Sequence, residues 1–145
     1  MKRSYRLQRI VDLANTAEQA ATGKLAGSER EVRGLEQQLA QLRAYRAEYE
    51  TRLQHGMAPL GAYALQEYHL FMRRLDEAIE GVVKKLSDRQ AQLTAQRQAL
   101  VLQRRKNEIL QGIQGRAAML EDRNDQLRAD IEATDRVASR VRATS

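Results

Sequence analysis

One short segment breaks an otherwise continuous background of helix-forming residues. Pro59 is the only proline in the 145 residues, and glycines lie close on both sides of it. Because proline and glycine interrupt helices, this segment predicts a turn at about residues 55–60. The flanking sequence is rich in Ala, Leu, Gln, Glu and Arg, which lose little rotamer freedom in a helix. We therefore expect one helix over about residues 4–54 and a second over about residues 61–142.

Apolar residues of the first helix recur at alternating intervals of four and three, as the seam of a coiled coil requires. The two columns of this seam are Val11, Leu25, Val32, Leu39 and Leu53, and Leu7, Ala14, Ala21, Leu35, Leu42 and Tyr49. Ser4, Glu18, Ser28 and Arg46 occupy seam positions without being apolar. The first helix is therefore expected to pack along one face, with an imperfect seam.

The second helix has a seam with the same spacing in its first half. Its members are Leu65, Tyr68, Met72, Leu75, Ile79, Val82, Leu86, Leu93 and Leu100. Gln103 and Asn107 then fill the frame, so we expect a three-residue phase slip and a shifted frame. The shifted frame contains Ile113, Ala117, Leu120, Leu127, Ile131, Ala138 and Val141. A short turn makes the helices antiparallel for about 50 residues, which leaves an overhang after Leu110.

These patterns predict an all-α fold of one domain over residues 1–145. Two long helices form an antiparallel coiled coil, a helical hairpin with an overhanging C-terminal helix end. The composition agrees. Aromatic residues make up only 4% of the chain, which is too few bulky apolar groups for an ordinary globular core, and 30% of the residues are charged. The apolar face of the overhang needs another molecule, since an isolated helix is marginal in water.

Catalytic and metal-binding chemistry is not favoured by this sequence. There is no cysteine, and the two histidines, His55 and His69, lack the spacing of a metal site. No phosphate-binding loop or nucleophile motif is present, so we expect neither an enzyme nor a bound cofactor or metal. The longest apolar run, residues 99–102, is far shorter than the roughly 20 residues of a membrane span. We therefore expect a cytoplasmic protein.

The chain is basic, with 25 Lys and Arg against 19 Asp and Glu, a net charge of +6. Its basic residues concentrate in a segment at the start and in a triplet: Lys2, Arg3, Arg6 and Arg9, and Arg104, Arg105 and Lys106. Elsewhere the two signs alternate, and neither cluster contains aromatic residues interleaved for base stacking. Nucleic-acid binding is thus not favoured, although a nucleic-acid-binding coiled coil and a generic structural coiled coil remain alternatives.

Aromatic residues gather beside the turn, and two sets of residues there recur at helical spacing. The sets are Gln38, Leu42, Tyr45 and Tyr49 on the first helix, and Phe71, Leu75, Ala78 and Val82 on the second. Such a stripe is often only the seam and its flank. Two helices bury a seam but not both flanks, so Tyr45 and Phe71 should be partly exposed. Exposed aromatic side chains beside an apolar strip indicate a binding face.

The segment Gln38–Tyr49, the Gly- and Pro-containing turn, and the segment Tyr68–Leu75 with the long Gln- and Arg-rich helix after it resemble the FliJ family of flagellar type III export proteins. The resemblance covers nearly the whole chain. A related stalk protein of virulence type III systems has a similar architecture and remains an alternative.

The resemblance implies a stalk-like coiled coil that binds the hexameric export ATPase, the cytoplasmic domain of the export gate and export chaperones. By this likeness the gate-binding face comprises Gln38, Leu42, Tyr45, Tyr49, Phe71, Leu75, Ala78 and Val82. The ATPase-facing end would comprise Lys2, Arg3, Arg6, Arg9 and the overhang. We expect a monomer in the cytoplasm, held at the inner membrane only through its partners.

Overall fold

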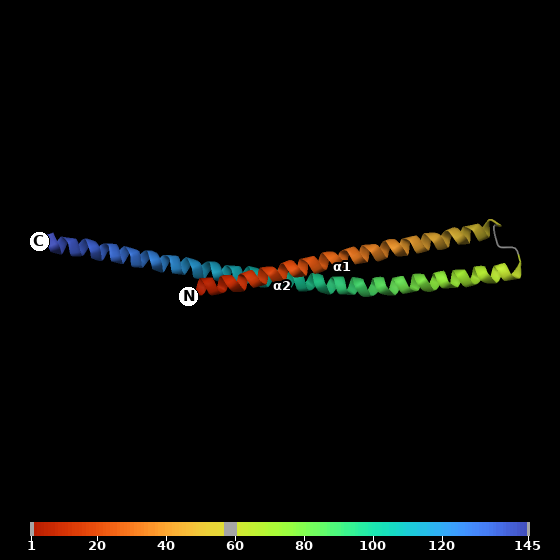
Figure 1. Cartoon of the computed structure of the whole chain (residues 1–145), viewed down its shortest axis with the longest axis horizontal. Helices are drawn as coiled ribbons and strands as arrows, with labels where there is room; N and C mark the ends of the chain where they lie inside the picture. Colours follow the sequence, from red (N-terminus) through yellow and green to blue (C-terminus); the bar gives the residue numbers. More distant parts are fainter. Residues whose placement is uncertain (1, 57–60, 145) are drawn as a thin grey trace. The chain divides into compact units, whose positions relative to one another are not determined.

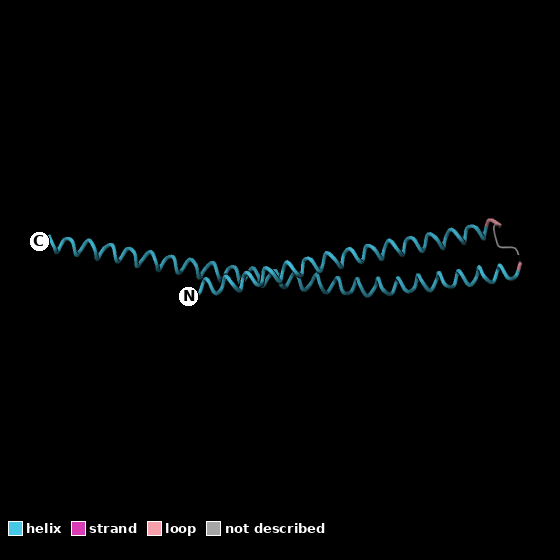
Figure 2. The backbone as a smooth tube through the Cα atoms, in the orientation of Figure 1, coloured by secondary structure: helices cyan, strands magenta, loops and turns pink. Residues whose placement is uncertain are grey.

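The structure is a computed structural model that describes residues 2–56 and 61–144. Two helices, α1 (Arg3–Gln54) and α2 (Ala62–Thr144), account for nearly all of the described chain (Figure 2). They pack against each other as an all-α helical hairpin, which confirms the predicted fold class (Figure 1). The chain divides into two compact units, which we call unit 1 (Met1–Ala20 and Leu100–Ser145) and unit 2 (Ala21–Ala99).

Glycines end α1 and begin α2. Gly56 and Gly61 have φ angles of +73° and +94°, a left-handed conformation that glycine adopts without a steric cost. The Gly56 N–H donates to the Leu53 carbonyl at 3.3 Å, and the Leu65 N–H donates to the Gly61 carbonyl at 3.1 Å. Pro59, on which the turn prediction rests, lies outside the described residues.

Unit 2 is held together by an apolar seam. Its most buried side chains are Val32 and Leu39 of α1 and Leu75, Val82 and Leu93 of α2. All five belong to the seam expected from the alternating spacing of four and three.

One seam position in the first turns of α2 was assigned wrongly. Leu65, which we expected in the seam, is exposed, and Ala64 is partly buried in its place. The seam of α2 therefore begins at Ala64, whose short side chain faces inward, and not at Leu65.

Two polar residues at seam positions of α1, Glu18 and Arg46, have polar partners on α2. In unit 2, the Arg46 guanidinium donates hydrogen bonds to Asp76 of α2 and to Glu50 on its own helix. In unit 1, Glu18 lies 3.6 Å from the Arg104 guanidinium. A polar residue in the seam therefore does not end the pairing of the two helices.

In unit 1 the original frame of α2 continues, so the predicted phase slip is wrong. Asn107 is only 3% exposed, and Gln103, one turn before it, is partly buried. The Asn107 amide donates to the Ala14 carbonyl at 3.0 Å and accepts from the Gln103 amide at 2.8 Å. These hydrogen bonds offset the cost of burying a polar side chain. As a result, α1 continues to pack against the original, unshifted seam column of α2.

The pairing of α1 with α2 also extends further than predicted. Within unit 1, the start of α1 reaches Glu121 and Asp125 of α2, not only Leu110. Beyond Asp125, α2 continues past the N-terminus of α1 (Figure 1). Three apolar residues of the expected shifted frame are 58–62% exposed there, namely Leu127, Ile131 and Val141, and Leu120, before Asp125, is 59% exposed. These apolar residues lie beside the column of α2 that packs against α1. Beyond Asp125 that column continues with polar residues.

Candidate partner-binding surfaces

Three aromatic rings from both helices form a cluster in unit 2. Tyr45 and Tyr49 lie one turn apart on α1, with ring centroids 5.0 Å apart. Phe71 of α2 lies with its ring centroid 4.9 Å from that of Tyr49 and 6.3 Å from that of Tyr45. We call these three residues the aromatic cluster. Edge and tilted contacts of this kind add to the stabilisation from burial.

The cluster is packed on its inner side and open to solvent on its outer side. Tyr45 is 46% exposed and Phe71 is 37% exposed, as expected for residues on the flanks of a two-helix seam. Tyr49 is partly buried, and its carbonyl accepts a hydrogen bond from the Tyr68 hydroxyl at 3.1 Å. The cluster is therefore a fixed, partly exposed aromatic surface.

Polar groups at the edge of the cluster hold the two tyrosines. Their hydroxyl oxygens lie 3.3 Å apart, and this hydrogen bond raises the pKa of Tyr45 above its ordinary value. The Arg52 guanidinium carbon lies 5.4 Å from the Tyr49 ring centroid, within the range of a cation–π interaction.

The eight residues of the predicted gate-binding face differ in exposure. Four are exposed, two are partly buried and two are buried in the seam: Gln38, Tyr45, Phe71 and Ala78; Leu42 and Tyr49; Leu75 and Val82. The exposed members can contact a partner directly. Leu75 and Val82 instead pack beneath them, so they support this face without forming its surface.

Ionic and capping contacts in unit 1 hold the first residues of α1 against α2. The Lys2 ammonium lies 2.7 Å from an Asp125 carboxylate oxygen. The Ser4 backbone N–H donates to Glu121 at 3.0 Å, and the Ser4 hydroxyl donates to the other oxygen of the same carboxylate. Glu121 therefore caps the N-terminus of α1 from the other helix, where a negative charge is favourable.

These contacts shift the pKa values of the groups that form them. Hydrogen bonds from the Ser4 hydroxyl and backbone N–H lower the pKa of Glu121. The hydrogen bond from Lys2 lowers the pKa of Asp125, and the same bond raises the pKa of Lys2.

The remaining members of the predicted ATPase-binding set, Arg3, Arg6 and Arg9, are exposed on α1. The sequence analysis missed two apolar neighbours of these arginines, Ile10 and Leu13, which are exposed as well. The sequence does contain a signal for their exposure, because Ile10 and Leu13 are apolar residues that fall outside both seam columns. This part of α1 therefore presents a basic surface that also contains apolar side chains.

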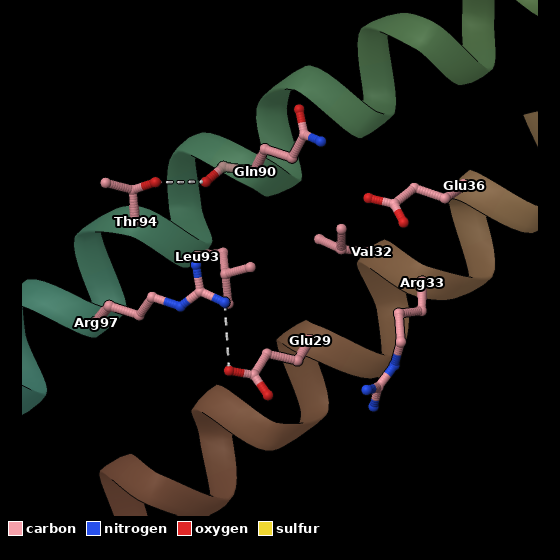
Figure 3. Close-up of a pocket in the computed structure, with 8 residues that line it drawn as sticks. All are labelled: Glu29, Val32, Arg33, Glu36, Gln90, Leu93, Thr94 and Arg97. Atoms are coloured by element: carbon pink, nitrogen blue, oxygen red, sulfur yellow. Dashed lines mark hydrogen bonds and ion pairs between the residues drawn. The ribbon is translucent and has the colours of Figure 1, made fainter.

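In unit 2 the helices leave a shallow groove of about 480 Å³ (Figure 3). Val32 and Leu93 face each other across it, and Arg97 lies 3.5 Å from Glu29 at one end. Arg33 and Glu36 also line the groove, so its charges have both signs. Such a lining is typical of the solvated flank of a coiled coil, and the groove has no cluster of like charges for a charged ligand.

A cluster of metal ligands and a membrane-spanning helix are both absent from residues 2–56 and 61–144. No three His, Asp or Glu side chains in these segments are grouped so that they could hold a metal ion. Neither α1 nor α2 contains a stretch that is apolar and long enough to span a membrane.

The comparisons with known proteins agree with the resemblance. The model of the FliJ family, described as flagellar FliJ protein, matches residues 1–143. No curated protein and no solved structure gives a significant match. A family match over essentially the whole chain, on a hairpin of two long helices, shows that this chain belongs to the FliJ family of flagellar export-apparatus proteins.

Proposed function

We propose that this chain is a non-enzymatic stalk of the flagellar export apparatus that connects the hexameric export ATPase to the cytoplasmic domain of the export gate. Unit 2 supplies the gate-binding surface. Unit 1 supplies the ATPase-binding surface, with the basic start of α1 and the overhang of α2. Family membership supports the setting of this function in the flagellar export apparatus.

The aromatic cluster is the observation that carries the gate-binding part of the proposal. Tyr45 and Phe71 are large, partly exposed rings fixed by Tyr49. Aromatic residues of this kind dominate the binding energy of many protein interfaces, because they bury much area at a small loss of conformational entropy. Leu75 and Val82 act from below by holding the helices together.

The test is a binding isotherm of the purified chain with the cytoplasmic domain of the gate. Replacing Tyr45 and Tyr49 by Ala should raise the dissociation constant by about thirtyfold or more, the effect of losing one strong hot spot. The matched control is Tyr63→Ala, which removes an equally large ring that is 76% exposed and outside the cluster. Circular dichroism should show equal helix content in both variants, and equal binding by both would disprove the assignment.

The ATPase-binding part rests on charge and on unpartnered apolar surface. Arg6 and Arg9 are exposed and have neighbours at Ile10 and Leu13 that offer apolar contact. Replacing both arginines by Glu should abolish binding to the ATPase while gate binding is retained, since charge reversal acts on recognition of an acidic surface. Loss of both activities would show instead that the variant is misfolded.

Escort of export chaperones belongs to the same proposal, as does a cytoplasmic location at the inner membrane through the gate. Co-sedimentation with membranes that contain or lack the gate protein tests the location. Sedimentation that does not depend on the gate would contradict it.

A further inference from the structure

The exposed apolar stripe of α2 has the length and the spacing of a second coiled-coil seam. From Leu120 to Val141 the exposed apolar residues fall on the positions of a seam about three heptads long, a length that favours a coiled coil. Leu120, Leu127 and Ile131 are about three-fifths exposed, and no other described segment of unit 1 covers them. An amphipathic helix with this seam pairs best with another helix of the same spacing.

We propose that the free chain pairs through this stripe with a second copy of itself, in an antiparallel arrangement centred between Asn124 and Leu127. Leu120 of each copy then lies opposite Ile131 of the other, so this apolar pair is formed twice. Asn124 lies opposite Leu127, which makes the centre of the seam weak and the association reversible.

Charges beside the stripe select this orientation. Arg123 and Asp130 are exposed and occupy the same flanking column, one heptad apart. In the antiparallel pair, Arg123 of one copy faces Asp130 of the other, and the symmetry of the pair repeats this contact. In a parallel pair in register, Arg123 faces Arg128 and Asp130 faces Asp135, so both contacts are repulsive. The contacts of Arg123 and Asp130 therefore favour the antiparallel second copy over a parallel one.

A shallow hollow lies along one side of the stripe. This hollow of about 230 Å³ is lined by Arg116, Met119, Leu120 and Arg123. These positions follow the spacing i, i+3, i+4 and i+7 of one helix face, so the hollow lies on the side of the stripe that carries the flanking arginines. Two of the four, Leu120 and Arg123, are the residues already matched to Ile131 and Asp130 of the second copy.

The pairing concerns the chain before it meets the export ATPase and goes beyond the proposed function. It differs from the monomer that the sequence led us to expect. Because the stripe lies on the overhang assigned to the ATPase, pairing and ATPase binding would exclude each other. The tests below use the purified chain alone, so their outcome is independent of whether the ATPase or the gate binds.

The first test is sedimentation equilibrium of the full chain over a range of concentrations. The native chain should show a reversible monomer–dimer equilibrium, and Leu127→Glu should be a monomer throughout. The control is Leu102→Glu, the same change at a residue that is 64% exposed outside the stripe, and it should dimerise like the native chain. A native chain that stays monomeric at all concentrations, or a control that dissociates as much as Leu127→Glu, overturns the proposal.

The second test fixes the orientation by exchanging charges. Arg123→Glu alone and Asp130→Arg alone should each weaken the dimer about tenfold, because each replaces two attractive contacts by two repulsive ones. The double variant R123E/D130R restores the attraction and should return the dissociation constant to its native value. In a parallel dimer, Arg123→Glu would instead face Arg128 and tighten the dimer, and this result overturns the antiparallel arrangement.

Discussion

The two units use the same helices with different chemistry at the seam. In unit 2 the buried positions are apolar, as at Leu39 and Leu75, and the exposed aromatic cluster flanks them. In unit 1 the pairing depends strongly on polar groups, with Asn107 buried in the seam and Glu121 capping α1. The difference teaches that α2 can pair with α1 through polar residues and thereby leave an apolar column free for another molecule.

The largest effect is expected from truncating the apolar seam of unit 2. Leu39→Ala removes a side chain that is 7% exposed and should lower the free energy of unfolding by about 2–4 kcal/mol, through lost burial and the cavity left behind. Urea unfolding followed by circular dichroism measures the loss. A change below about 1 kcal/mol would show that the seam of unit 2 is not the main apolar contribution to stability.

A smaller loss is expected at the polar seam of unit 1. Asn107→Ala removes the amide that donates to the Ala14 carbonyl and accepts from Gln103, and should cost about 1–2 kcal/mol of unfolding free energy. Hydrogen exchange should show the loss of protection in residues 3–18 before it appears near the aromatic cluster. Uniform loss along α1 would mean that the polar seam of unit 1 and the apolar seam of unit 2 do not differ in stability.

A still smaller gain is expected at an exposed glycine inside α2. A Cβ added at Gly112 meets no atom within 4 Å, so Gly112→Ala should raise the free energy of unfolding by about 0.5–1 kcal/mol through helix propensity. Gly61→Ala is the contrasting variant, because its φ of +94° strains any other residue, and it should destabilise. Unfolding curves of the two variants that shift in the same direction would contradict this account.

The smallest effect is local and depends on pH. The pKa values of Glu121 and Asp125 are lowered in the folded chain, so their contribution is complete above their ordinary values and is lost as the pH falls through the lowered ones. The start of α1 should therefore fray in acid while the seam of unit 2 persists. Hydrogen exchange, corrected for its intrinsic pH dependence, measures the fraying, and Glu121→Gln should remove most of the acid dependence. A native chain with no such dependence would refute the role of the cap.

Periodicity predicted the seam of α1 because burial in a two-helix coil depends mainly on spacing. Val11, Val32 and Leu39 are buried where the spacing placed them. The same reasoning failed at Asn107, since a polar residue was taken to end the frame. Its burial depends on the Ala14 carbonyl, 93 residues away in the chain, and no local pattern reveals such a partner.

The candidate sites were predictable to different degrees for a similar reason. The exposure of Tyr45 and Phe71 follows from their place beside the seam, and the structure confirms it. The cap from Glu121 to Ser4 was not predictable, because it depends on how far α1 extends along α2. The cross-helix contacts set how far α1 extends along α2, and this cannot be predicted from the spacing of apolar residues within either helix.

The cap between Ser4 and Glu121 also has a consequence for the order in which the chain folds. Its two residues are 117 positions apart, so on the ribosome α1 is complete long before its capping carboxylate has been synthesised. Contacts near the turn close the shortest loops and cost the least entropy, so the helices should join there first and close towards the cap. The N-terminus of α1 is thus the last part of the hairpin to be secured, and translation of residue 121 sets the earliest moment for it.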